Sequence, residues 1–264
     1  GYSRFVGQIA ANASRPGDLT VSRFTVDGAP IQGYGNPQND GPAHTVLALL
    51  TEGAAEDPGA ALTLAEPYLK VLARLANDSV TFDPWEFAVG RVFSTEYLIR
   101  RALRRGEQVA AQQGDLLLAD QCRQAATDVE RRLLEFRDPE RGYLRAGRDY
   151  ALPWLDTISG LDTGLIGGIL ADFDVTDDVM NVDDPWVQQT MRALEEHFTG
   201  RWAANRRWVA AGELGCGIGR FPEDTNDGFG STGGNPWVVS TLWAAQFHYR
   251  LVERVRDRCG RSDR

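Results

Sequence analysis

The stretch TLAEPYLKVLARLAN, residues 63–77, carries the fold signal most clearly. Its apolar side chains recur at helical spacing and form one stripe, made of Leu64, Tyr68, Leu72, Leu75 and Ala76. A stripe with this period predicts an amphipathic helix that buries one face. Thr63 and Glu66 stand three residues apart, which is the spacing of a capping box, so we expect the helix to begin there.

Helical patterns continue along the chain. Residues 91–110 and 115–136 predict two further long helices. Residues 184–186 (Asp-Pro-Trp) and 235–237 (Asn-Pro-Trp) each place a capping side chain before a proline. We therefore expect helices to start at both places and to run to about residues 198 and 255. Weaker helical patterns cover residues 2–13, 42–51 and 158–171.

Strand signals are weak by comparison. Residues 19–26 alternate briefly, which fits a short strand or an extended loop, and no Asn-Gly turn joins two alternating runs. About eight helices predict an all-α fold. Composition does not break along the chain, so we expect one domain over residues 1–264. The long connections are rich in Gly, Pro, Asp, Asn and aromatic residues, as loops that build a site often are: 14–41, 78–90, 137–157 and 199–234.

Composition narrows the range of partners. The 264 residues carry a formal net charge of -9, which argues against nucleic acid and anionic membranes. No apolar run approaches the roughly 20 residues that span a bilayer, and no signal peptide is visible. Cys122, Cys216 and Cys259 lie far apart, so we interpret them as free thiols. One disulfide between two of them is the alternative. The scattered histidines show no metal-binding spacing, and we expect neither a metal nor a cofactor.

Residues 82–91, FDPWEFAVGR, allow two interpretations. Acids are common near helix N-termini, so Asp83 and Glu86 could precede the helix over 91–110, with Trp85 as a packing residue. Pro84 makes a continuous helix through the stretch improbable. Alternatively, the acids and the ring belong to a site. The local sequence favours the first interpretation, and the other loops favour the second.

Four loop clusters share one mixture of carboxylates, amides, arginine and aromatic rings. They are residues 33–42, 83–87, 152–160 and 217–237. Sugars need this mixture because their hydroxyls require paired donors and acceptors while their C–H faces stack on rings. A nucleotide site would favour positive charge, and the last cluster lacks the spacing of a phosphate-binding loop. The clusters therefore predict a carbohydrate site.

Three of these stretches resemble the glucoamylase family of inverting glycoside hydrolases, family 15. GYGNPQNDGPA (33–43) resembles its G-x-W-G-x-P-Q-N-D-G-P-A stretch, and FDPWEF (82–87) resembles its D-L-W-E-E stretch. GIGRFPEDT…GGNPW (217–237) resembles its V-G-R-Y-P-E-D…G-N-P-W segment. The motifs follow the family's order across residues 20–250. The resemblance implies an (α/α)6 barrel, a toroid of two rings of helices with the active site in the loops at one end.

The resemblance also implies roles for individual residues. Glu86 matches the family's general acid, and Arg220 matches an arginine that binds sugar hydroxyls. Tyr34 stands where the family has a tryptophan near the acid. The ring of Trp85 beside Glu86 would favour a protonated carboxyl that can donate to a glycosidic oxygen. The substrate-binding candidates are Tyr34, Asp83, Trp85, Arg220, Asp224 and Trp237.

The sequence departs from the family pattern in several places. Phe87 replaces a second glutamate that hydrogen-bonds the neighbouring sugar, and Pro84 replaces a leucine, which leaves the fine substrate preference open. The sequence contains no match to the family's catalytic base, nor to its early Arg-Asp pair. We therefore expect residues 1–264 to be an incomplete catalytic domain that lacks N-terminal and C-terminal helices. We expect this chain to hydrolyse little by itself.

The resemblance implies release of glucose from the non-reducing ends of α-glucans, by a protein that is monomeric in its full-length form. Members of the family are often secreted. Two alternatives stay open: a non-catalytic carbohydrate-binding or regulatory barrel with a degenerate site, and a related α-glucosidic or trehalose hydrolase on the same barrel.

Overall fold

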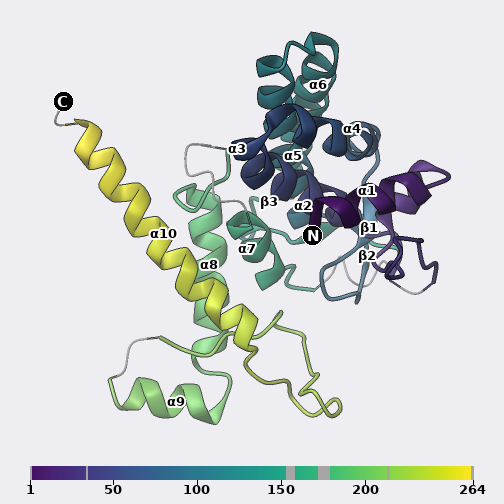
Figure 1. The fold of residues 1–264 in the computed structure, drawn as a ribbon. Helices are drawn as coiled ribbons and strands as arrows, with labels where there is room; N and C mark the ends of the chain where they lie inside the picture. Colours follow the sequence, from purple (N-terminus) through teal and green to yellow (C-terminus); the bar gives the residue numbers. More distant parts are fainter. Residues whose placement is uncertain (1, 34, 153–157, 172–178, 213–214, 263–264) are drawn as a thin grey trace. The chain divides into compact units, whose positions relative to one another are not determined.

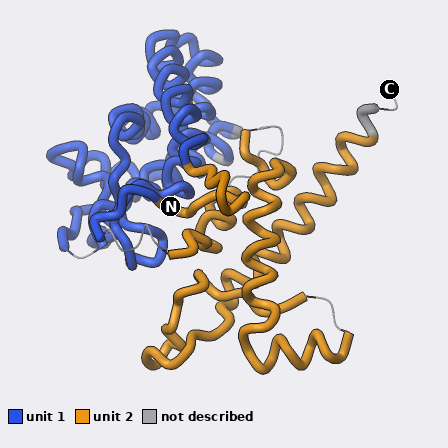
Figure 2. The backbone as a smooth tube through the Cα atoms, turned by 180° about the vertical axis from the view of Figure 1, so that it is seen from behind, with its two compact units in different colours: residues 1–135, 148–152 blue, residues 136–147, 153–264 orange. Residues whose placement is uncertain are grey.

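The computed structural model describes residues 2–33, 35–152, 158–171, 179–212 and 215–262 (Figure 1). Helices make up most of the regular structure in these residues, as the periodicity predicts. The chain divides into two compact units, shown in different colours in Figure 2. Unit 1 comprises residues 1–135 and 148–152, and unit 2 comprises residues 136–147 and 153–264. None of the described helices is long and apolar enough to cross a membrane.

Unit 1 contains the first elements of the chain. They are α1 (Tyr2–Asn12), a 3-10 turn (Pro16–Thr20), α2 (Asp40–Ala48), a π-helical turn (Leu49–Gly53), α3 (Ala54–Glu56) and α4 (Pro58–Leu75). The strands β1 (Val80–Phe82) and β2 (Val89–Val92) come next, followed by α5 (Phe93–Gln112) and α6 (Leu116–Leu133). The helices predicted over 63–77, 91–110 and 115–136 are thus confirmed as α4, α5 and α6.

Helix α5 lies at the centre of unit 1, where it packs along α6 and against α2 and α4. Both apolar and charged side chains of α5 are buried, and Glu96 is completely so. Its carboxylate accepts hydrogen bonds from Arg91 Nε at 3.0 Å and Arg132 Nε at 3.3 Å. Arg100 of α5 donates to Glu130 of α6 across 2.8 Å. These pairings offset the cost of removing the charges from water and join the two helices.

The start of α4 differs from the prediction. The helix begins at Pro58 rather than at Thr63, and the Asp57 carboxylate caps it by accepting a bond from the backbone N–H of Ala60 at 3.0 Å. Glu66 pairs instead with Lys70, one turn further on, at 2.6 Å. The predicted capping box of Thr63 and Glu66 is therefore wrong. Proline at the first helical position suits this earlier start, because its missing N–H has no partner there.

Unit 2 contains the remaining elements. A 3-10 turn (Leu134–Phe136) leads into it, and β3 (Arg137–Asp138) pairs antiparallel with β4 (Tyr143–Leu144). The short strand β5 (Gly147–Arg148) lies where the chain passes back to unit 1, to which Arg148 belongs, and it completes the sheet order β1-β2-β5. The helices are α7 (Thr163–Leu170), α8 (Pro185–Thr199), α9 (Ala203–Ala210) and α10 (Val238–Ser262).

Helix α7 is buried along its whole length and packs against α10. The ring of Trp243 from α10 packs onto Gly167, where an added Cβ would lie 2.7 Å from the ring. A larger residue at this position would have to displace the ring. The weak pattern over 158–171 is therefore confirmed for its second half.

The predicted starts of two helices of unit 2, α8 and α10, have different outcomes. The start of α8 is confirmed, since Asp184 caps the backbone N–H of Trp186 at 2.8 Å and Pro185 is the first helical residue. The helix start predicted at residues 235–237 is wrong, because α10 begins at Val238. Pro236 belongs to the preceding loop, where it packs against Gly217.

Two of the connections also differ from expectation. The connection over 199–234 contains α9, which no sequence pattern predicted. Residues 19–26, for which a short strand or an extended loop was expected, contain the end of the 3-10 turn and one isolated bridge from Phe24 to Pro30.

Candidate active site

Residues 82–91 contain the turn of a β-hairpin, between Phe82 at the end of β1 and Val89 at the start of β2. Strands β1 and β2 pair antiparallel, with Phe82 opposite Val89, and the backbone N–H of Asp83 donates to the carbonyl of Ala88 at 2.9 Å. Helix α5 starts only at Phe93, after β2. The interpretation of this stretch as a helix start is therefore wrong. Proline in the turn and β-branched residues in the flanking strands favour the hairpin.

Glu86 occupies a strained position in this turn. Its φ of 55° lies in the left-handed region, which a non-glycine residue rarely adopts. The backbone N–H of Glu86 donates to the carbonyl of Asp83 at 3.0 Å, and the N–H of Phe87 donates to Oδ1 of Asp83 at 2.7 Å. Asp83 is 8% exposed, so its carboxylate serves here as the cap that holds the turn. Residues held in such conformations concentrate at functional sites.

The first motif lies directly against the Glu86 carboxyl. The side-chain amide of Gln38 donates to Oε1 of Glu86 at 3.0 Å. Gly35, with a φ of 82°, approaches so closely that an added Cβ would lie 2.5 Å from the same oxygen. Sequence analysis did not assign Gln38 or Gly35 a role of their own. The signal was present, because both stand in the stretch that resembles the family.

Hydrogen bonds to β1 fix the place of Gln38. The carbonyl of Pro37 accepts from the backbone N–H of Phe82 at 3.0 Å and from the hydroxyl of Thr81 at 3.1 Å. Asn39, which is buried, donates its side-chain amide to the carbonyl of Val80 at 3.1 Å. Residues 37–39 therefore run beside β1, and the Gln38 side chain reaches the turn that carries Glu86.

The aromatic neighbours of Glu86 differ in exposure. Trp85 is half-buried in the turn, and Phe87 on the other side is 48% exposed. Tyr34, which the resemblance placed near the acid, lies outside the described residues. A role for Tyr34, Asp83 or Trp85 in substrate binding therefore stays a prediction.

Unit 2 contains the second group of predicted residues. Arg220 forms a two-point ion pair with Asp224, at 2.8 Å and 2.7 Å, and both side chains are buried. The guanidinium lies over the ring of Trp237, with 4.6 Å from its carbon to the ring centroid. Paired bonds to a planar guanidinium fix its orientation, and the stacked ring adds a cation–π contact. The three residues that the sequence singled out in this loop therefore form one cluster.

The backbone around Arg220 is attached to the helices of unit 2. Its carbonyl accepts from the backbone N–H of Thr163 at 2.8 Å and from the Thr163 hydroxyl at 3.0 Å, at the start of α7. The backbone N–H of Trp237 donates to the carbonyl of Ile218 at 2.9 Å, just before α10. Glu86 belongs to unit 1 and Arg220 to unit 2. The resemblance assigns both residues to one active site, and that assignment stays a prediction.

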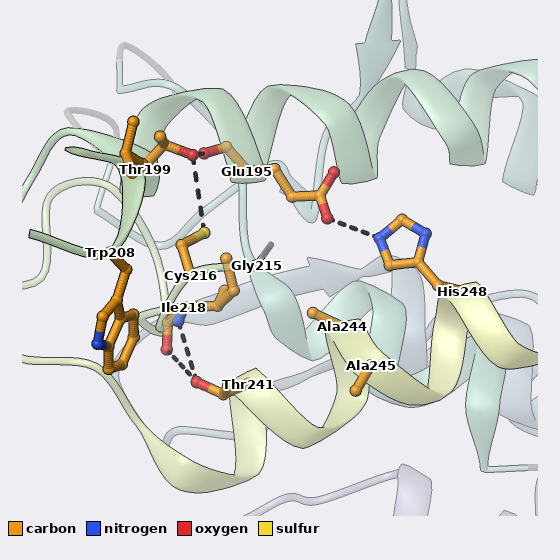
Figure 3. A pocket seen from close by; sticks show the side chains of 11 residues that line it. Glu195, Thr199, Trp208, Gly215, Cys216, Ile218, Thr241, Ala244, Ala245 and His248 are labelled. Carbon is orange, nitrogen blue, oxygen red and sulfur yellow. Dashed lines mark hydrogen bonds and ion pairs between the residues drawn. The ribbon is translucent and has the colours of Figure 1, made fainter. Parts of the chain in front are cut away.

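Unit 2 also contains a pocket of about 740 Å³ that the sequence did not indicate (Figure 3). Side chains from α8, α9, α10 and the loop before α10 line it. Glu195 and His248 face each other from α8 and α10 across 2.6 Å. Burial raises the pKa of the Cys216 thiol, which contacts the Thr199 hydroxyl at 3.7 Å. A thiol that is harder to ionise is a poor nucleophile. Neither Arg220, Asp224 nor Trp237 lines this pocket.

The three cysteines are free, as interpreted from their spacing. Among the described residues, no group of three or more His, Cys, Asp or Glu side chains could hold a metal ion.

Comparison with known proteins gives one consistent result. The sequence model of the glycosyl hydrolases family 15 matches residues 6–261. A glucoamylase of Blastobotrys adeninivorans is 29% identical over 287 residues, covering 97% of this chain and 45% of the relative. Glucoamylase S2 of Saccharomyces cerevisiae is 30% identical over 246 residues, covering 84% of this chain and 31% of the relative. The chain thus spans about half the length, or less, of the curated relatives it matches.

Solved structures agree with this result. A glucoamylase from Saccharomycopsis fibuligera matches 95% of this chain with a TM-score of 0.82 and 26% identity, over 57% of its own length. The Hormoconis resinae glucoamylase matches 97% of this chain with a TM-score of 0.75 and 26% identity, over 45% of its own length. These structures are (α/α)6 barrels, and the expected all-α class is confirmed. Since the family model covers nearly the whole sequence, the chain belongs to family 15 of the glycosyl hydrolases.

Proposed function

We propose that this protein is a glucoamylase-type hydrolase, which releases glucose from the non-reducing ends of α-glucans with inversion at the anomeric carbon. Membership of family 15 and the names of the relatives support the reaction class. The observation that carries the proposal is the Glu86 carboxyl, set at a strained hairpin turn with an amide donor and a glycine against it.

In this proposal, the bond from Gln38 orients the Glu86 carboxyl. A protonated carboxyl has one hydroxyl and one carbonyl oxygen, and the carbonyl oxygen is the better acceptor. Oε1 accepts the amide N–H of Gln38, so Oε2 is the oxygen that would carry the acidic proton. In this proposal, Oε2 donates its proton to the glycosidic oxygen as the bond to the anomeric carbon breaks.

The proposal also assigns sugar binding and the activation of water. Arg220 and Asp224 would hold hydroxyls of the terminal sugar, and the ring of Trp237 would cover a C–H face. A second carboxylate would activate water on the opposite face of the sugar, at about 6.5–9.5 Å from Glu86. None of the motifs that support the resemblance contains that base, and we propose that it lies outside residues 1–264.

The test uses the natural gene product, here termed the whole protein, with maltose and soluble starch as substrates. We expect release of β-glucose, which NMR of the anomeric proton would detect. Glu86→Gln keeps the shape of the side chain but removes the transferable proton, so we expect kcat to fall by about 10²–10⁴-fold. Glu140→Gln, at an exposed acid in unit 2, is the matched control and should keep the wild-type rate.

Several outcomes would overturn parts of the proposal. A Glu86→Gln protein with the wild-type rate would remove Glu86 from the acid role, and release of α-glucose would exclude inversion. Binding of starch without any hydrolysis would favour the non-catalytic carbohydrate-binding alternative. Residues 1–264 expressed alone should hydrolyse little maltose. Rapid turnover by that chain would place the base within it.

A further inference from the structure

Phe229 lies at the tip of the loop over residues 224–234 with its side chain fully exposed, at 103% of the reference area. A single exposed apolar side chain is common on protein surfaces and has no meaning by itself. Phe229 differs because its backbone N–H and that of Gly230 donate to the Asp227 carboxylate. Its loop also begins at Asp224, the ion-pair partner of Arg220 in the proposed sugar site.

Asp227 holds the tip. Its Oδ1 accepts from the backbone N–H of Phe229 at 2.8 Å and from that of Gly230 at 2.7 Å, while its Oδ2 accepts from the hydroxyl of Thr232. The hydroxyl and the two N–H groups lower the pKa of Asp227, so the carboxylate stays ionised and keeps these bonds at neutral pH. The tip is therefore a fixed turn that presents one aromatic ring.

The base of the loop is attached just as firmly. The carbonyl of Thr225 accepts the backbone N–H groups of Thr232 and Gly234, both at 3.0 Å. The guanidinium of Arg201 donates to the carbonyl of Asp224 at 2.7 Å, and the indole N–H of Trp202 donates to the carbonyl of Gly234 at 3.1 Å. The buried ion pair of Arg220 and Asp224 thus lies at the foot of the loop, and Phe229 lies at its outer end.

The chemistry of the tip selects the kind of partner. A stable interface with another protein buries about 800 Å² of each partner around a few closely packed anchor side chains. In the sequence, Phe229 stands among small and polar residues, including Asn226, Asp227 and Ser231. An α-glucan offers the complementary surface, because the C–H faces of its sugar rings meet an aromatic face while its hydroxyls meet polar groups.

We propose that Phe229 is a stacking platform for a glucosyl unit of an α-glucan chain, beyond the sugar held by Arg220 and Asp224. The inference rests on the proposed function. It predicts that the enzyme distinguishes long chains from short ones through this ring. Maltose would be too short to use the platform, and maltoheptaose would reach it.

The test compares kcat/KM for maltoheptaose with kcat/KM for maltose in the whole protein. Phe229→Ala should lower this ratio by about three- to tenfold, mainly through KM for the longer substrate, as expected for loss of one aromatic contact. Phe229→Tyr keeps the ring and should keep the ratio. Val26→Ala is the matched control, because Val26 is 97% exposed in a loop of unit 1. An unchanged ratio in Phe229→Ala, or an equal loss in Phe229→Tyr, would overturn the proposal while the hydrolase function stood.

A binding measurement separates the two proposals. If the unmodified whole protein hydrolyses no α-glucan, the proposed function fails, and the platform is tested by migration in a native gel that contains amylopectin. Retardation of the unmodified protein that is lost in Phe229→Ala and kept in Phe229→Tyr would support the platform. Equal mobility of all three proteins would overturn the platform. A Phe229→Ala protein that differs only in sedimentation would also overturn it, because that result would identify Phe229 as a contact between copies of the protein.

Discussion

Gln38 and Glu86 stand 48 residues apart in the sequence, yet the amide nitrogen of Gln38 donates to Oε1 of Glu86 across 3.0 Å. The two side chains come from different motifs, one before α2 and one in the hairpin before α5. The bond joins two separate stretches, and in the proposed function it would orient the carboxyl for proton transfer.

Removing this amide should impair the reaction more than the fold. We expect Gln38→Ala in the whole protein to lower kcat by about 10- to 100-fold, because a misplaced acid donates poorly. The thermal midpoint should change little. Gln32→Ala, at an exposed glutamine of the same segment, is the control and should keep the wild-type kcat. A wild-type kcat in Gln38→Ala would show that the bond does not position the acid.

The close approach of Gly35 predicts a steric effect. A Cβ at this position would lie 2.5 Å from Oε1 and 2.9 Å from Cδ of Glu86, at a φ that disfavours side chains. Gly35→Ala should therefore displace the carboxyl and lower kcat by about 100-fold or more. Gly41→Ala is a matched control on α2, since nothing lies within 4 Å of its added Cβ. That variant should keep full activity, and steady-state kinetics of both variants would check the difference.

Acid should weaken the contact between α5 and α6 through Glu130. Burial alone would raise its pKa, but hydrogen bonds and charge from Arg104 and Arg100 outweigh burial and lower the pKa below the unfolded value of 4.5. The folded state then binds this proton less readily than the unfolded state. The stabilisation is complete above pH 4.5 and is lost as the pH falls through the folded pKa.

Glu130→Gln should therefore reduce the free energy of unfolding at pH 7 by about 1–2 kcal/mol. The free energy of unfolding should also fall less steeply at acid pH than in the unmodified protein. Thermal midpoints between pH 7 and pH 3 would measure both effects. Glu253→Gln, at an exposed position of α10, should leave the curve unchanged. An acid limb that keeps its slope in Glu130→Gln would assign the acid sensitivity to other carboxylates.

The true start of α4 can be tested in the same way. Asp57→Ala removes the cap of the backbone N–H of Ala60 and should cost about 1 kcal/mol of stability. Thr63→Ala lies inside the helix, where the hydroxyl donates to the carbonyl of Gly59, and should change stability by less than about 0.5 kcal/mol. Chemical denaturation would measure both variants. A larger loss from Thr63→Ala would restore the capping box.

Local periodicity was sufficient for the long helices, because each buries one continuous face. It failed where a distant partner decides the structure. The strands around the Glu86 turn are short, and β1 gains hydrogen bonds from residues 37–39, which no local pattern indicates. Helix α10 starts later than expected, and the residues before it bind a distant segment: Pro236 packs against Gly217 and the N–H of Trp237 donates to Ile218. Arg220, Asp224 and Trp237 could be grouped from sequence because they share one loop.

The pairing of residues 37–39 with β1 also limits how this part of the chain can change in length. The Glu86 turn is closed by Phe82 opposite Val89, and Phe82 in turn donates to Pro37. One residue inserted between Phe82 and Val89 would shift the register and turn the following side chains to the opposite face. Among natural variants, insertions should therefore be rare between residues 82 and 89.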